Sequence, residues 1–256
     1  MRARADDRRM FMRTAGVLIG LAWVVLWLWG QSPYGRFLNH GEMGLVRLDD
    51  GGHLLTFAAG WTLMIAAMML PTSLPLIAAF RTLVRQRHNH KWLLVLLVAS
   101  YLGIWSLFGL MAHIGDWGLH QVVEGSPWLL SHLWLLGVTP LLLAGLYQFT
   151  PLKYYCLDKC RSPLSFIASH WHGNHLTAET FWMGVHYGLY CLGCCWSLML
   201  LMFAVGVGNF GWMLALGAVM FIEKTMPWGR RLSAPLGVLL AGWGLIFILG
   251  NVLGYT

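Results

Sequence analysis

The sequence has few charged residues. Asp, Glu, Lys and Arg together make up 11% of its 256 residues, whereas a soluble globular protein carries about 25%. Hydrophobic residues make up 58% of the chain. This composition excludes an ordinary soluble domain and is typical of a protein whose surface faces lipid.

Motifs for several common chemistries are also missing. The sequence has no Gly-x4-Gly-Lys-Ser/Thr string, so ATP is not predicted as a partner. It has no Cys-x2-Cys-His string, which argues against covalently attached haem. The net charge of +7 comes mostly from short basic stretches between apolar segments, so no nucleic acid is needed to explain it.

Seven apolar segments account for most of the chain. A span needs about 20 apolar residues, and helices are the form that satisfies the backbone in lipid. The sixth segment is short for a span. The predicted fold is an all-α polytopic transmembrane helical bundle of about seven spans. The segments are 15–30, 54–80, 92–111, 128–149, 181–207, 212–222 and 234–255.

The distribution of positive charge predicts the orientation. Alternate gaps between the segments hold 15 of the 17 Lys and Arg residues, and the remaining gaps hold only Arg36 and Arg47. Positive residues stay on the cytoplasmic side, so the N-terminus is predicted in the cytoplasm and the C-terminus outside. Without the short sixth span, Arg230 and Arg231 would lie on the wrong side.

The same pattern predicts the domain organisation. Residues 1–14 form a basic cytoplasmic tail, and residues 15–256 form a single transmembrane helical domain. A cytoplasmic loop at about 150–180 carries cysteine and histidine. The first span could be a cleaved signal peptide, but its core ends in bulky residues around Trp27 and Trp29 where a cleavage site requires small ones. We therefore interpret it as an uncleaved anchor.

A stripe of sulfur runs along the fifth segment. Cys191 and Cys195 share one helical face, Met199 continues that face, and Cys194 lies about a quarter of a turn aside. Such soft ligands suit Cu(I), and thiolates also suit zinc. The alternative is that these residues are ordinary packing, because free cysteine and methionine also fill apolar cores.

The second segment offers two further thioethers. Met64 and Met68 share a face, with Pro71 and Pro75 further along the same segment. Broken helices often line the binding sites of transporters. A methionine-packed helix with a proline kink is the simpler alternative.

The cytoplasmic loop contains Cys156-x3-Cys160, whose sulfurs would share one face of a helix. Two ligands are too few for a tetrahedral site, so they would need the cysteines of the fifth segment, His186 or a partner. His186 lies about 180° from Cys195 on an ideal helix, so an unbroken helix cannot bring both to one ion. Thiols on this side of the membrane stay reduced, which argues against an oxidase that makes disulfides.

Two other groups have open interpretations. His170, His172 and His175 form either another metal cluster or a pH-sensitive loop. Glu223 could be a metal ligand, a proton carrier or the partner of a nearby basic residue, and we favour the pairing.

Three strings together resemble a bacterial family of predicted metal-binding integral membrane proteins, a domain of unknown function. They are Ala67-Met68-Met69-x-Pro71, Cys156-x3-Cys160-Arg161-x-Pro163, and Gly193-Cys194-Cys195-Trp196 followed by Glu223-Lys224. The resemblance covers about residues 61–229. The sequence departs from the family pattern at Gly208, because relatives usually carry methionine at this position, directly before the asparagine that is Asn209 here. It implies a bacterial cytoplasmic (inner) membrane location and a metal role for the five cysteines.

We therefore predict a membrane protein that binds a soft metal, copper first and zinc second, for delivery or transport. The partners are the lipid bilayer and a protein in a membrane complex. A metal-dependent oxidoreductase and a non-catalytic assembly subunit remain alternatives. The candidate ligands are Cys156, Cys160, Cys191, Cys194, Cys195, Met199, Met64, Met68 and His186.

Overall fold

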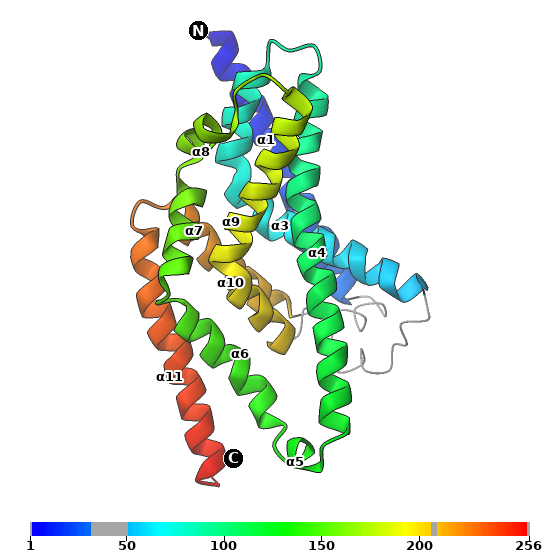
Figure 1. Cartoon of the computed structure of the whole chain (residues 1–256), viewed down its shortest axis with the longest axis vertical. Coiled ribbons are helices and arrows are strands. Elements are labelled where there is room, and N and C mark those ends of the chain that lie inside the picture. The colour runs from blue at the N-terminus through cyan, green and yellow to red at the C-terminus, as the bar shows by residue number, and fades with distance from the viewer. Residues whose placement is uncertain (1, 32–50, 206–208, 255–256) are drawn as a thin grey trace.

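The computed structural model describes residues 2–31, 51–205 and 209–254, which form helices and no strands (Figure 1). Arg36, Arg47 and Gly208 lie outside the described residues. The predicted N-terminal tail is helical from Arg2 and continuous with the first apolar segment. The helices are α1 (Arg2–Gln31), α3 (Gly51–Val84), α4 (His90–Glu124), α5 (Pro127–Leu130), α6 (Trp134–Tyr147), α7 (Pro151–Arg161), α8 (Pro163–His170), α9 (Leu176–Val205), α10 (Phe210–Thr225), the 3-10 helix η2 (Gly229–Leu232) and α11 (Ser233–Val252).

Five helical stretches are long and apolar enough to cross a membrane. They correspond to the first, second, third, fifth and seventh predicted spans, so the all-helical class is confirmed. The total of seven spans and the orientation of the termini stay predictions. The five stretches are Arg9–Gln31, Phe57–Val84, His90–Glu124, Leu176–Met202 and Gly229–Val252.

A break at Thr150, one residue beyond the fourth predicted span, separates α6 from α7. The backbone of Thr150 is extended (φ −74°, ψ 141°), and Pro151 begins α7. The residue before a proline avoids helical geometry, whereas proline fits the first helical position well. As a result α6 and α7 are bent by 67° and together form one broken span or a re-entrant loop. The cysteines of the predicted loop are therefore carried on a separate short helix.

The sixth predicted segment forms a helix that is short for a membrane. α10 has 16 residues, which gives a length of about 24 Å at 1.5 Å per residue, against about 30 Å of hydrocarbon. It begins at Asn209, whose side chain accepts a hydrogen bond from the Trp212 amide at 3.3 Å.

Helix α9 is the centre of the bundle. It packs against α4, α6, α7, α8 and α10, while α3 packs against α1, α4, α8 and α10 (Figure 1). Helix α11 packs on α6 at the periphery. The candidate ligands therefore lie on these two helices, α3 and α9, or on α7, which packs against α9.

Two glycines on α9 let α4 approach closely. A Cβ added at Gly184 would lie 2.7 Å from the Leu97 carbonyl oxygen, and one at Gly188 would lie 3.0 Å from Ile104 Cβ. Small residues at helix contacts allow backbones to pack this tightly in membranes. The contact fixes α4, and with it Tyr101, beside the cysteines of α9.

We predict that Gly184→Ala destabilises the fold by about 1–3 kcal/mol, because the added methyl group overpacks the α4–α9 contact. Gly103→Ala on α4 is the matched control, since nothing lies within 4 Å of a Cβ at that position. The measurement is the thermal unfolding midpoint in detergent. Equal midpoints for the two variants would contradict the prediction.

Candidate metal centre

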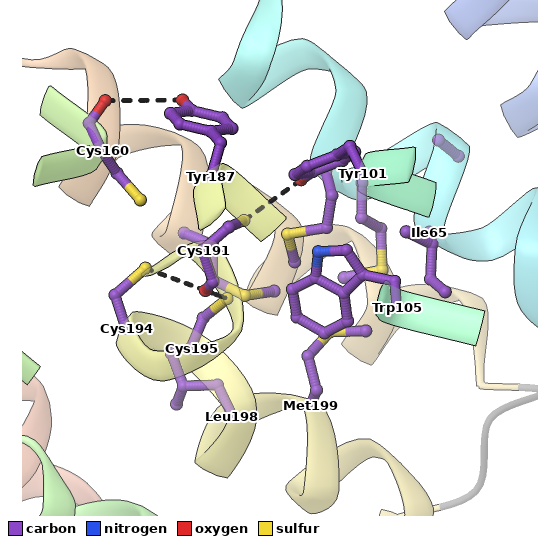
Figure 2. Close-up of a cluster of buried hydrophobic side chains, with 14 of the residues drawn as sticks. Ile65, Tyr101, Trp105, Cys160, Tyr187, Cys191, Cys194, Cys195, Leu198 and Met199 are labelled. Atoms are coloured by element: carbon purple, nitrogen blue, oxygen red, sulfur yellow. Dashed lines mark hydrogen bonds between the residues drawn. The ribbon is translucent and has the colours of Figure 1, made fainter. Parts of the chain in front are cut away.

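Four cysteines from two helices form a buried sulfur cluster, defined as Cys160, Cys191, Cys194 and Cys195 (Figure 2). All five cysteines of the chain are free thiols. The three on α9 are each 1% exposed. The Cys160 side chain on α7 points toward α9 and interacts with the side chains of Cys191 and Cys194. Helix α7 therefore adds a fourth thiol to the three of α9.

Two of the three thiols of α9 point toward the backbone. Cys194 Sγ and Cys195 Sγ donate hydrogen bonds to the Cys191 carbonyl oxygen at 3.1 and 2.9 Å. Among the described residues, no group of three or more His, Cys, Asp or Glu side chains is arranged to hold a metal ion. Because a thiol is a weak donor, these two bonds give way readily. To bind one ion together, the side chains of Cys194 and Cys195 would have to rotate about their Cα–Cβ bonds.

Cys156 lies one helical turn from Cys160 and faces a different part of α9. A Cβ added at Gly193 would lie 2.6 Å from Cys156 Sγ, so glycine makes room for this thiol. The Tyr147 hydroxyl donates to the Gly193 carbonyl oxygen. Both cysteines of α7 are therefore on the face that meets α9, as their spacing predicted, but Cys156 lies at the edge of the sulfur cluster.

A buried lysine contacts the sulfur cluster. Lys224 on α10 is 6% exposed. Its ammonium donates to Cys191 Sγ at 2.8 Å and lies 3.7 Å from Cys195 Sγ and 3.8 Å from Met69 Sδ. Sequence reasoning counted this lysine only as a cytoplasmic charge and as part of a family motif. The sequence did contain a signal for its burial. The apolar positions of α10, such as Met213 and Met220, continue at helical spacing to Lys224, which places the lysine on the same face.

Two tyrosines also contact the cluster and were missed in the sequence. The Tyr101 hydroxyl on α4 lies 3.1 Å from Cys191 Sγ. The Tyr187 hydroxyl donates to the Cys160 carbonyl oxygen at 3.5 Å, and the rings of the two tyrosines are 5.9 Å apart. The Cys191 sulfur therefore has both a hydroxyl and an ammonium group beside it, which makes it the most polar of the sulfur positions.

The candidate methionines lie in the same core. Met64 and Met199 are fully buried, and Met68 is 2% exposed. Met199 and Trp105 belong to the same core cluster (Figure 2), while Met68 packs toward Gly217 of α10. The thioether that approaches the lysine belongs to Met69. Met64, Met68 and Met199 thus line the core around the sulfur cluster, and their role as ligands stays a prediction.

His186 faces away from the sulfur cluster, as its position on the helix indicated. Its Nδ1 bonds the Trp182 carbonyl oxygen at 2.8 Å, and its ring lies 5.2 Å from that of His170. His172 and His175 lie in a loop that Glu179 holds in place. The Glu179 carboxylate accepts hydrogen bonds from the backbone N–H groups of residues 172–175. The structure does not bring His186 to the cysteines.

Glu223 forms a buried ion pair, which agrees with the pairing interpretation. Its carboxylate lies 2.9 Å from Lys153 Nζ of α7, and the Ser233 hydroxyl of α11 donates to it at 2.7 Å. Lys153 also donates to the Gln148 side-chain oxygen, and Arg161 donates to the Glu223 carbonyl oxygen. The partner is distant in sequence, so this network ties α7 to α10 and α11.

We predict that breaking this pair is costly and that removing both charges restores most of the loss. Lys153→Met or Glu223→Gln alone should cost about 3–5 kcal/mol, because each leaves an uncompensated buried charge. The double variant should be closer to the parent. A double-mutant cycle of unfolding free energies in detergent is the measurement, and purely additive losses would show that the two groups do not interact.

Comparison with known proteins supplies the family. A family model described as PpoB2, copper chaperone, matches residues 58–247. No curated protein and no solved structure matches the chain. The matched region contains all five cysteines together with Lys153, Glu223 and Lys224, and it agrees with the resemblance noted from the sequence motifs. Because the match covers well over half of the sequence, the chain belongs to the PpoB2 family of copper chaperones, and its chemistry is copper-related metal handling.

Proposed function

We propose that the protein is an integral membrane copper chaperone that holds Cu(I) on the sulfur cluster and passes it to a protein partner. The observation that carries this proposal is the meeting of four buried, reduced thiols from α7 and α9 in a member of a copper chaperone family. Thiolates are soft ligands of the kind that suits Cu(I).

The geometry supports binding that remains reversible. Cys191 and Cys195 are four residues apart on one face of α9, and Cys160 reaches the same space from α7. Turning the thiols of Cys194 and Cys195 away from the Cys191 carbonyl oxygen costs little, because their hydrogen bonds are weak. Cu(I) can therefore exchange between neighbouring sulfurs during delivery.

The outer surfaces of the helices support the membrane location. Large apolar side chains are exposed on several helices, more than a soluble monomer tolerates. The N-terminus and the C-terminus lie at opposite ends of the bundle (Figure 1), as an odd number of crossings requires. We propose seven crossings of the bacterial inner membrane, with the broken α6–α7 pair as one and α10 as another. Examples of the exposed side chains are Leu18, Val95, Val238 and Ile246.

We predict that the detergent-purified protein, loaded with Cu(I) under reducing conditions, retains near-stoichiometric copper. X-ray absorption should show sulfur neighbours at about 2.3 Å, the length typical of a metal–thiolate bond. Elemental analysis names the metal. If zinc is retained in preference to copper, the thiol site stands and the metal assignment is wrong.

Variants of single cysteines test the site itself. Cys191→Ser should lower Cu(I) affinity more than about 100-fold, because loss of a direct ligand exceeds the 10–100-fold effect of a supporting residue. Cys156→Ser, which removes the thiol that faces Gly193, should have a smaller effect. A folded Cys191→Ser, Cys195→Ser double variant that holds as much copper as the parent contradicts the proposal.

A further inference from the structure

Lys224 and a bound Cu(I) ion need the same sulfur atoms. The ammonium group is 2.8 Å from Cys191 Sγ and 3.7 Å from Cys195 Sγ. An ion bound by these two sulfurs lies about 2.3 Å from each, which brings it into the space of the ammonium. Two positive charges this close repel strongly in a low-dielectric interior. The two cations therefore exclude each other from this face of α9.

Within the part of the chain that the structure describes, the Lys224 ammonium donates hydrogen bonds to sulfur atoms alone. Among the described residues, its hydrogen-bond contacts are the sulfurs of Cys191, Cys195 and Met69. The adjacent carboxylate of Glu223 is directed to Lys153 and Ser233 instead. Tyr101 from α4 shares Cys191 with the lysine but carries no formal charge.

We propose that Lys224 is a specificity-determining residue whose ammonium alternates with Cu(I) on Cys191 and Cys195. This inference rests on the proposed copper function and concerns the control of that site. When the metal enters, the hydrogen bond from Lys224 to Cys191 Sγ breaks, each sulfur that still carries a proton loses it to solvent, and the sulfur–copper bonds form. Copper stays in the +1 state, and no electron is transferred.

The exchange favours a monovalent ion over a divalent one. The lysine stays on α10 when copper binds, so two thiolates, one ammonium and one Cu(I) ion together carry no net charge. A divalent ion adds one uncompensated charge, which is costly to bury. The site therefore accepts Cu(I) in preference to Zn(II), although thiolates bind both.

The same exchange assists release. The lysine is anchored on α10 close to the sulfurs, so it competes with the metal at a high effective concentration. As copper is withdrawn by a partner, the ammonium takes back Cys191 and opposes rebinding. This arrangement suits a chaperone, because several thiols hold the copper ion and the ion must still be released to the partner.

The test compares Lys224→Met with the parent and with Lys159→Met, which removes an exposed lysine of α7. Each protein is loaded with Cu(I), and the transfer of copper to bathocuproine disulfonate is followed by absorbance. We expect release from Lys224→Met to be at least about tenfold slower than from the parent, with Lys159→Met unchanged. The Cu(I)/Zn(II) affinity ratio of Lys224→Met should fall by at least about tenfold in competition titrations, because the charge that opposes Zn(II) is gone.

Unchanged or faster release, with an unchanged Cu(I)/Zn(II) ratio, overturns the role of Lys224 while leaving the sulfur site intact. Failure of the parent to bind copper overturns the proposed function and this inference with it. Thermal unfolding and size-exclusion profiles check that each variant folds. If Lys224→Met does not fold, Lys224→Gln takes its place, since it keeps a hydrogen-bond donor for Cys191 and removes only the charge.

Discussion

The buried ion pair between Lys153 and Glu223 is the interaction on which the arrangement of the sulfur cluster depends. The two side chains are 0% and 2% exposed, and the pair joins α7 to α10. Lys153 is seven residues before Cys160 and lies on the same buried face of α7. The ion pair therefore sets the position of α7 along the axis of the bundle. On α10, Glu223 directly precedes Lys224. One buried contact therefore places both the fourth thiol and the lysine that contacts the cluster.

The sulfur cluster combines tight burial with weak local bonds. Its cysteines are almost fully enclosed, yet the bonds that hold Cys194 and Cys195 in place are thiol donations to a carbonyl group. Such bonds are readily replaced by metal–thiolate bonds. The close packing of α4 on Gly184 and Gly188 holds α4 and α9 together independently of these thiol bonds. The proposed loading and unloading of copper depends on this division between closely packed helices and weakly held thiols.

Much of the helical organisation could be read from local pattern. The membrane-length helices follow apolar runs of about 20 residues, and the break before Pro151 follows from the geometry that proline imposes on its predecessor. The fourth and sixth segments were harder, because hydropathy alone does not show that α6 begins only at Trp134 or that α10 is only 16 residues long. The opposing directions of His186 and Cys195 followed from helical periodicity, and the structure agrees.

The sequence by itself determined the membrane-type composition, the helical class, the shared face of Cys191 and Cys195, and the family motifs, because each of these depends on residues close together in the chain. The tertiary structure alone decided that Cys160 joins the cysteines of α9, that Glu223 pairs with Lys153, and that Lys224 turns toward sulfur. These contacts join residues about 30 to 70 positions apart. Local periodicity states which face of a helix is buried, but only the packing of one helix against another decides which atoms meet there.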